Sequence, residues 1–201
     1  MIHKTTVEPT FLPVTVDECR KQMGNSNDGD NNRDFIILSR IRAVTHWFEN
    51  LTNTKLCEQT VTAYGAQFGN IVLNHLHEKA INLCRPLQAV SSIKYIDING
   101  VDQTMLLSDY LVSTALHRVS PAYGLTCWPS AREQDESVRI EYVSGYASAD
   151  LIPAELKEAI LFTVGAYENF QPAIEAGIRP QTVPYAALQL VQQHLDYREW
   201  F

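Results

Sequence analysis

Two histidines placed two positions apart are the most direct candidates for metal chemistry in this sequence. His75 and His77 would point to one side of a β-strand, because side chains alternate between the two faces of a strand, and imidazole nitrogens bind zinc. Glu78 and His3 are further candidate ligands, but no spacing ties them to the pair. Isolated pairs of this kind more often lie on a solvated surface. We therefore expect no metal and no cofactor, with a small metal-dependent enzyme as the alternative.

The other reactive residues also lack the patterns that chemistry requires. Asp28 and Asp30 could open a calcium loop, but its twelfth position, which must be a glutamate, is Ser39. Glu155 and Glu158 lie one turn apart in an expected helix, where their position near its start explains them without catalysis. The arginines at 118, 132 and 139 could bind a phosphate, but acidic residues near them in sequence weaken that interpretation. Because no nucleophile, phosphate-loop or dinucleotide motif is present either, we expect no enzyme.

The four cysteines are spread along the chain without metal-binding or redox spacing. They are Cys19, Cys57, Cys84 and Cys127, and no CxxC or CxxH occurs. The first eighteen residues have no apolar core of a signal peptide, which favours a product that stays in a reducing compartment. Buried, reduced thiols are therefore expected, and two disulfides remain the alternative.

Composition describes a globular protein with an acidic surface. Of the 201 residues 45% are hydrophobic and 19% are charged, enough for one good core. A net charge of −7 argues against a general nucleic-acid binder, although it permits a protein that lies near DNA without gripping it. No apolar run approaches the length of a membrane span, so no membrane partner is expected.

Four helices are predicted. Thr15 and Glu18 form a capping box for a helix that ends near Met23. Residues 33–51 carry an apolar seam, formed by Ile37, Ile41, Val44, Phe48 and Leu51. Ile36, Leu38 and Trp47 lie off that seam, so this helix has two apolar aspects. Residues 151–170, with Pro153 at the first helical position, are apolar most of the way round and should form the central helix. A last helix starts at Pro184 and places four residues on one face, namely Tyr185, Leu188, Val191 and Leu195.

Between the second and third helices the sequence changes to short strands. The clearest hairpin runs through residues 89–107, with the Asn99-Gly100 dipeptide that favours tight turns. Residues 137–143 alternate apolar and polar side chains, as in a strand with one buried face. Residues 24–32 read as a flexible loop, and residues 65–80 as a projecting insertion. The expected fold class is α+β: one domain over residues 1–201, a small helical bundle with a central mostly apolar helix and an inserted small antiparallel sheet.

From Arg85 to Tyr146 the sequence resembles the head–tail connector family of tailed phages, also called head-completion adaptors. The resemblance rests on residues in a fixed order: Arg85-Pro86-Leu87, Val90, Ile93, Tyr95, Asp97, Gly100, Tyr110, Trp128-Pro129, Val138, Ile140, Tyr142, Gly145 and Tyr146. Pro153, Leu156, Ala159, Ile160 and Tyr167-Glu168-Asn169 are similar to its central helix, and Pro184 to Arg198 to its last one.

The resemblance implies a structural protein of the virion neck, made in the host cytoplasm. Family members form a ring, usually of twelve subunits, beneath the portal protein; DNA passes through it without specific binding, and the next neck or tail-completion protein docks on it. The acidic balance suits such a channel wall, since phosphates would be repelled. The alternative within the virion is another neck or tail-completion protein.

Two sets of residues are expected to carry these contacts. The second helix should pack between subunits of a ring through Ile36, Ile37, Arg40 and Trp47. A docking tail at residues 196–201 should reach the portal through Tyr197, Arg198, Trp200 and Phe201, because aromatics and arginine are the usual anchors of interfaces. Both sets could instead be core and a frayed end.

Overall fold

The computed structural model describes residues 1–24, 31–68, 80–123, 127–168 and 185–195. Helices and antiparallel strands are both present, which confirms the α+β class. The chain groups into two compact units, here called the β unit (Met1–Thr10 and Glu58–Gly145) and the helical unit (Phe11–Cys57 and Tyr146–Phe201). The description of residues 1–201 as one adaptor domain stays a prediction.

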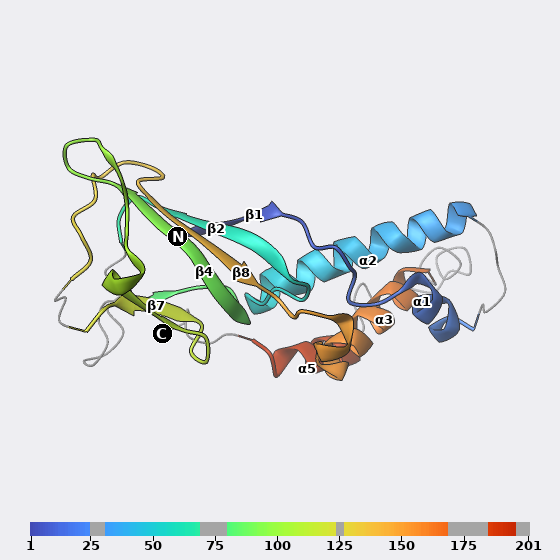
Figure 1. The fold of residues 1–201 in the computed structure, drawn as a ribbon. Helices are drawn as coiled ribbons and strands as arrows, with labels where there is room; N and C mark the ends of the chain where they lie inside the picture. The colour runs from blue at the N-terminus through green and yellow to red at the C-terminus, as the bar shows by residue number, and fades with distance from the viewer. Residues whose placement is uncertain (25–30, 69–79, 124–126, 169–184, 196–201) are drawn as a thin grey trace. The chain divides into compact units, whose positions relative to one another are not determined.

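The β unit is built on two antiparallel sheets (Figure 1). The larger sheet has the order β1-β2-β8-β4-β5, formed by Ile2–Val7, Gln59–Gly65, Val138–Ser144, Leu87–Ile96 and Asp102–Thr104. The smaller sheet has the order β3-β7-β6, formed by Ile81–Asn82, Arg118–Pro121 and Tyr110–Ser113, and a short 3-10 helix, η1 (Leu107–Asp109), precedes β6.

Strand β8 lies at the centre of the larger sheet and shows the predicted alternation. Val138, Ile140 and Tyr142 are fully buried, whereas the residues between them are half-buried. β8 pairs with β2 on one side and β4 on the other. The backbone N–H of Cys84 donates to the Tyr142 hydroxyl oxygen at 3.3 Å, and the Tyr142 hydroxyl and His3 Nδ1 hydrogen-bond at 2.8 Å. The buried hydroxyl is therefore satisfied, as a buried polar group must be.

An aromatic stack closes the core of the β unit and corrects part of the predicted insertion. Phe68 is buried and stacks on Trp128, with ring centroids 4.9 Å apart and an angle of 4° between the rings. Gly65 is the last residue of β2. The start of the expected projecting segment at 65–80 therefore belongs to the sheet and the core, because a large aromatic ring gains more from burial than from exposure. Residues 69–79 lie outside the described residues.

The predicted hairpin forms with a wider turn than the Asn99-Gly100 dipeptide suggested. β4 and β5 pair as far as Ile96 and Asp102, so residues 97–101 make the turn. One carboxylate oxygen of Asp97 accepts from the backbone N–H groups of Asn99 and Val101, each at 2.9 Å. These bonds lower the pKa of the Asp97 carboxyl, with Val101 the largest cause. Gly100 supplies the positive φ that the turn requires, 85°.

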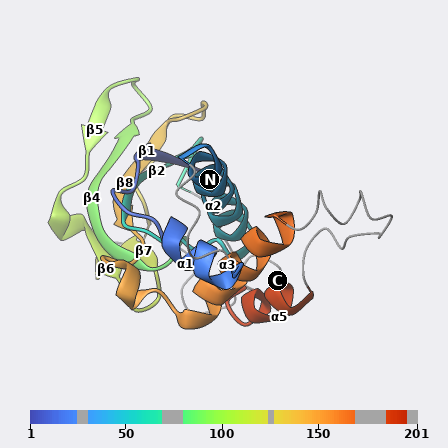
Figure 2. The same ribbon diagram turned by 90° about the vertical axis from the view of Figure 1, so that its right-hand side faces the viewer.

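The helical unit contains α1 (Val16–Gln22), α2 (Asn31–Thr52), α3 (Ala154–Glu168) and α5 (Tyr185–Gln192), with the 3-10 turn η2 (Ala149–Leu151) before α3 (Figure 2). The capping box is confirmed: the Glu18 backbone N–H donates to Thr15 Oγ1, and the Thr15 backbone N–H donates to the Glu18 carboxylate. The predicted loop at 24–32 is shorter at its end, because α2 already includes Asn31 and Asn32; residues 25–30 lie outside the described residues.

The apolar seam of α2 enters the core as predicted, except at its end. Ile37, Ile41, Val44 and Phe48 are buried, whereas Leu51 is exposed in the last turn. Each buried seam side chain contributes about 1.5–3 kcal/mol relative to an exposed one. These four residues therefore hold α2 in a fixed rotation about its axis.

Two further helix predictions need correction by small amounts. Pro153 precedes α3 instead of opening it, and its carbonyl accepts from the backbone N–H of Lys157 at 3.3 Å. It still fits there, since a residue at this position needs no N–H for the helix. Tyr185 is exposed at the first residue of α5, whereas Ala187 and Val191 are buried.

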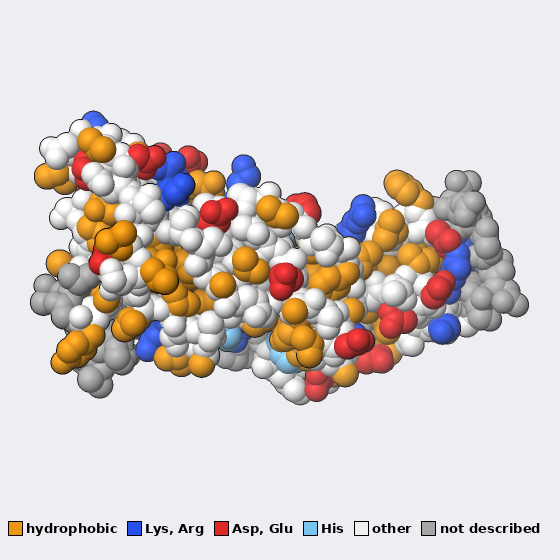
Figure 3. All heavy atoms as spheres, viewed as in Figure 1, with side chains coloured by type: hydrophobic (Ala, Val, Ile, Leu, Met, Phe, Trp, Pro, Cys, Tyr) orange, Lys and Arg blue, Asp and Glu red, His pale blue; other side chains and the backbone are white. Residues whose placement is uncertain are grey.

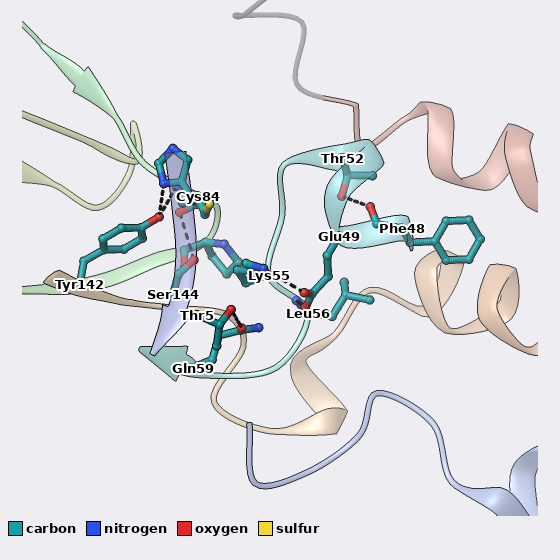
Figure 4. A network of polar contacts seen from close by, with 12 residues as sticks. Thr5, Phe48, Glu49, Thr52, Lys55, Leu56, Gln59, Cys84, Tyr142 and Ser144 are labelled. Atoms are coloured by element: carbon teal, nitrogen blue, oxygen red, sulfur yellow. Dashed lines mark hydrogen bonds and ion pairs between the residues drawn. The ribbon is translucent and has the colours of Figure 1, made fainter. Parts of the chain in front are cut away.

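The end of α2 is fixed by a buried carboxylate (Figure 4). Asn53 has a φ of 50°, and the Thr54 N–H reaches back to the Glu49 carbonyl at 3.2 Å, which is a Schellman ending. The Glu49 carboxylate then accepts from the Leu56 backbone N–H at 2.8 Å and from Lys55 Nζ at 3.2 Å. Glu49 thereby binds both the turn and the segment that leads to β2.

Replacing Glu49 should reveal this role. We expect Glu49→Ala to lower the free energy of unfolding by about 3 kcal/mol, because the Lys55 charge and the Leu56 N–H would lose their buried partner. Urea unfolding followed by circular dichroism measures the difference. The matched control is Glu8→Ala, an exposed carboxylate, which should change the value by less than about 0.5 kcal/mol. Equal small effects from both variants would contradict the assignment.

Candidate subunit interface

The candidate interface lies on the side of α2 opposite its buried seam. Because 100° separates successive residues of a helix, burial of the seam turns a second row of residues outward. The exposed row is Ile36, Ser39, Ala43, Trp47 and Asn50. None of the five carries a charge, although a solvent-facing helix surface is normally charged or strongly polar.

Large and small side chains alternate along this row in a way that suits helix packing. Ile36 is 46% exposed and Trp47 is 38% exposed, and they lie three turns apart with Ser39 and Ala43 between them. Small residues at the middle of a helix surface allow another helix to approach closely, while the large ones fill its grooves. Figure 3 shows hydrophobic side chains reaching the surface of the helical unit.

Trp47 is held in position from below. Its ring lies 4.8 Å from that of Phe48, centroid to centroid, at an angle of 36°, and Phe48 is buried in the core. A half-exposed tryptophan that rests on the core loses little conformational freedom when a partner covers it, which is the usual property of an interface anchor.

Arginines border this row on both sides. Arg42 is exposed and Arg40 is half-buried. The carboxylates of α2 are occupied elsewhere: Asp34 pairs with Arg20, and Glu49 with Lys55. The uncharged row of α2 is therefore flanked by arginines.

The predicted contact residues separate into three groups. Ile36, Arg40 and Trp47 lie at the outward side of α2. Ile37 is only 1% exposed and belongs to the core, where a neighbouring subunit could not reach it, so we assign it to the seam. Tyr197, Arg198, Trp200 and Phe201 lie outside the described residues.

The comparisons with known proteins can now be placed beside this geometry. No protein-family model matches the sequence, and no curated protein matches it. Solved structures do match its fold. A chain in the neck of an empty gene transfer agent particle, computed with C6 symmetry, has a TM-score of 0.70 at 16% identity; the match covers 98% of this chain and 97% of that chain. This chain has the fold of a gene transfer agent particle protein.

Two further structures of gene transfer agent particles give the same result. A chain in the virion of the native particle has a TM-score of 0.73 at 16% identity, and a chain in the native neck, computed with C12 symmetry, has 0.65 at 14%. Each match covers 98% of this chain and 97% of the other. At such low identity the gene transfer agent chains share the fold with this one over nearly its whole length.

The structure also shows exposed apolar residues that the sequence reasoning missed. One group in the β unit extends from the hairpin turn to two residues beyond β7, and its members are Ile98, Val101, Leu106, Leu107, Leu111, Leu116 and Tyr123. In the helical unit Leu151 and Phe162 are also exposed. Only the hydrophobic type of these residues is visible in the sequence, because their exposure depends on which face each short element turns to the core.

The cavity beside the aromatic stack of the β unit lacks acid–base side chains. A cavity of about 250 Å³ lies beside the aromatic stack, and its lining of Gln67, Phe68 and residues 127–131 contains no carboxylate and no imidazole. No three histidine, cysteine or acidic side chains cluster as metal ligands among the residues described. His75 and His77 lie outside them. Within the same ranges no helix is long and apolar enough to cross a membrane.

No disulfide joins the four cysteines, and the expectation of buried thiols holds for three of them. Cys19, Cys57 and Cys84 are buried and Cys127 is exposed. Burial raises the pKa of the Cys19 thiol to about 11 and that of the Cys57 thiol to about 12. Since the thiolate is the reactive form, both should be inert at neutral pH.

Thiol labelling tests this arrangement. In the native protein at pH 8, an aromatic disulfide reagent should modify Cys127 rapidly. It should modify Cys19 and Cys57 only after unfolding, because the reagent does not reach the core and burial keeps both thiols protonated. Peptide mapping by mass spectrometry identifies the modified residue, and Cys127→Ser is the control that should abolish the fast phase. Rapid labelling of Cys19 in the native protein would contradict the buried assignment.

Proposed function

We propose that this protein is a structural component of the neck of a phage-like virion, where copies of the chain form a ring. The observation that carries the proposal is the near-complete fold match to chains in two neck structures. The uncharged, partly apolar row on the outward side of α2 supports it independently, because a surface of this kind is favoured when a partner covers it.

A ring of twelve copies is the stoichiometry that we propose. The similar necks were computed with C6 and C12 symmetry, and a twelvefold axis contains a sixfold one. Lateral packing in a closed ring needs a surface on one side of each subunit that meets a different surface on the next. We place one of these surfaces on α2, at Ile36, Arg40 and Trp47.

Within the neck, we propose the adaptor position between the portal protein and the next neck or tail-completion protein. In that position DNA would pass through the ring without being bound. The net charge of −7 supports such a passage, since an acidic wall repels phosphate. The same fold match would fit another neck or tail-completion protein, and binding to the portal distinguishes the two.

A negative charge introduced on the outward side of α2 should prevent assembly of the ring without unfolding the protein. We expect Trp47→Asp or Ile36→Asp to weaken self-association at least about tenfold, because a carboxylate would be desolvated in the contact. The melting temperature should remain within a few degrees of the unsubstituted protein's value. Sedimentation equilibrium and circular dichroism measure the two quantities.

A matched control separates this contact from general solubility effects. Leu107→Asp places the same charge at an exposed apolar residue of the β unit and should leave self-association unchanged. If Trp47→Asp instead unfolds the protein, Trp47 belongs to the core and the interface assignment is wrong.

The C-terminal segment is proposed to dock on the portal. The last helix, α5, ends at Gln192, three residues earlier than the predicted end of its apolar face at Leu195, and the six residues beyond Leu195 include Tyr197, Trp200 and Phe201. Deleting residues 197–201 should leave the melting temperature nearly unchanged and abolish co-sedimentation with portal rings of the same particle. Particles assembled with the deletion should package DNA and then leak it or remain tailless. Normal docking, or a large loss of stability, would refute this role.

A further inference from the structure

We propose that two histidines make the β unit sensitive to acid: His3 and His117 hold the segment 83–87 in place only while their Nδ1 atoms carry no proton. This segment connects β3 of the smaller sheet with β4 of the larger sheet. Protonation of both histidines would loosen the segment together with β1 and the turn between β6 and β7. The inference does not depend on the proposed ring.

His117 binds both ends of the segment. The Leu83 backbone N–H donates to the His117 carbonyl oxygen at 2.9 Å, and the Leu87 backbone N–H donates to His117 Nδ1 at 3.2 Å. The second bond fixes the state of the ring, because Nδ1 accepts a hydrogen bond only in the neutral tautomer that carries its hydrogen on Nε2.

His3 reaches the same segment through the hydroxyl of Tyr142. The Cys84 backbone N–H donates to the hydroxyl oxygen at 3.3 Å, and this oxygen lies 2.8 Å from His3 Nδ1. Burial raises the pKa of the Tyr142 hydroxyl well above its ordinary value, so the hydroxyl keeps its hydrogen. Since the oxygen already accepts from Cys84, the hydrogen is donated to His3, whose Nδ1 must then be unprotonated.

Ser144 binds the middle of the segment. Its hydroxyl oxygen lies 3.1 Å from both the Cys84 and the Pro86 carbonyl oxygens, to which the hydroxyl can donate. Ser144 is fully buried at the end of β8, close to Tyr142 and Cys84 (Figure 4). Of the side chains in these hydrogen bonds, only the two imidazoles ordinarily titrate between pH 5 and pH 8.

A proton on either ring would break a bond that holds the segment. An imidazolium carries hydrogen on both nitrogens, so the Nδ1–H of His117 would face the N–H of Leu87. The Nδ1–H of His3 would leave the hydroxyl hydrogen of the fully buried Tyr142 without its acceptor. Both outcomes oppose folding, because a buried donor that loses its acceptor is costly. Both histidines are half-buried, so solvent protons have access to them.

The described strands around the segment direct no carboxylate toward the histidines. The charged residues of β1, β4, β5 and β8 share the other face of the larger sheet, since they alternate with its core-facing residues or pair with such residues across strands. These charged residues are Lys4, Lys94, Asp102, Arg139 and Glu141. Asp109 precedes the end of β6 that lies away from the turn, and β2 and β3 carry no charged residue.

The remaining groups near the segment do not favour protonated imidazoles either. The titratable groups on the core side are the thiol of Cys84 and the hydroxyls of Tyr95, Tyr110 and Tyr142. Arg85 lies in the segment and Arg118 follows His117 in β7. Both are cations, as is the α-amino group of the chain start near His3, and a positive charge disfavours another one nearby.

Asparagine variants test the proposal, because Asn Oδ1 can occupy the position of Nδ1 and accept the same hydrogen bond but cannot bind a proton. Asparagine also tolerates the positive φ of His117, 52°. We expect the melting temperature of the unsubstituted protein to fall by about 5–10 °C between pH 7 and pH 5, because the unfolded chain binds protons that the folded segment excludes. In His3→Asn/His117→Asn the fall should be less than half as large.

A matched variant and a second measurement locate the effect. His46 is exposed on α2, so His46→Asn should lose as much thermal stability at pH 5 as the unsubstituted protein. Hydrogen exchange followed by mass spectrometry, corrected for the intrinsic pH dependence of exchange, should show lost protection at pH 5 in β1 and residues 83–87 of the unsubstituted protein. Peptides from α2 should keep their protection.

Three results would overturn the proposal. One is an equal fall in melting temperature for the unsubstituted protein and the double variant. Another is unchanged protection of residues 83–87 at pH 5, and the third is a loss of protection that is uniform over both units. If the double variant does not fold at pH 7, the exchange measurement on the unsubstituted protein decides between these results and the expected one.

Discussion

Burial of the α2 seam is the constraint on which the helical unit depends. Ile37, Ile41, Val44 and Phe48 must all enter one core, and a helix that buries four such residues cannot rotate about its axis without exposing them. Everything on the opposite side is thereby turned to the solvent, whatever its polarity. The outward position of Trp47 is a consequence of where Phe48 and Val44 are buried.

This constraint joins fold to assembly. The buried carboxylate of Glu49 ends the helix at a defined residue through its bonds to Leu56 and Lys55, so the outward row has a defined length as well as a defined direction. A rigid, uncharged row that ends in a supported tryptophan pays little conformational entropy on binding. The chain thus has a preformed helix surface, as the proposed lateral contact of a ring requires.

Much of the fold could be predicted because its signals are local. The capping box of Thr15 and Glu18, the spacing of the α2 seam and the alternation in β8 each depend on residues close together in sequence. The features that could not be predicted involve residues distant in sequence. Phe68 stacks on Trp128, sixty residues away, and no local sequence pattern indicates that contact. The end of α2 was also predicted incorrectly. Leu51 continues the spacing of the seam, but it is exposed because the last turn of the helix does not face the core.

The candidate site was predictable only in part for the same reason. Ile36 and Trp47 could be recognised as apolar residues off the seam, but Ile37 was assigned to both roles, because spacing alone does not say which of two adjacent isoleucines is buried. Glu155 and Glu158 were explained by their position near the positive end of the helix dipole. Their place on an exposed face with Phe162 became visible only when the neighbours of α3 were known.

The central claim is that α2 carries a lateral contact of a closed ring. Brief chemical cross-linking of the concentrated protein, followed by mass measurement of single particles, tests it most directly because it also traps labile assemblies. The account predicts a ladder of species that ends at one closed ring, at twelve times the mass of the chain. A distribution that ends at the dimer, continues without limit as an open filament, or contains only the monomer would contradict it.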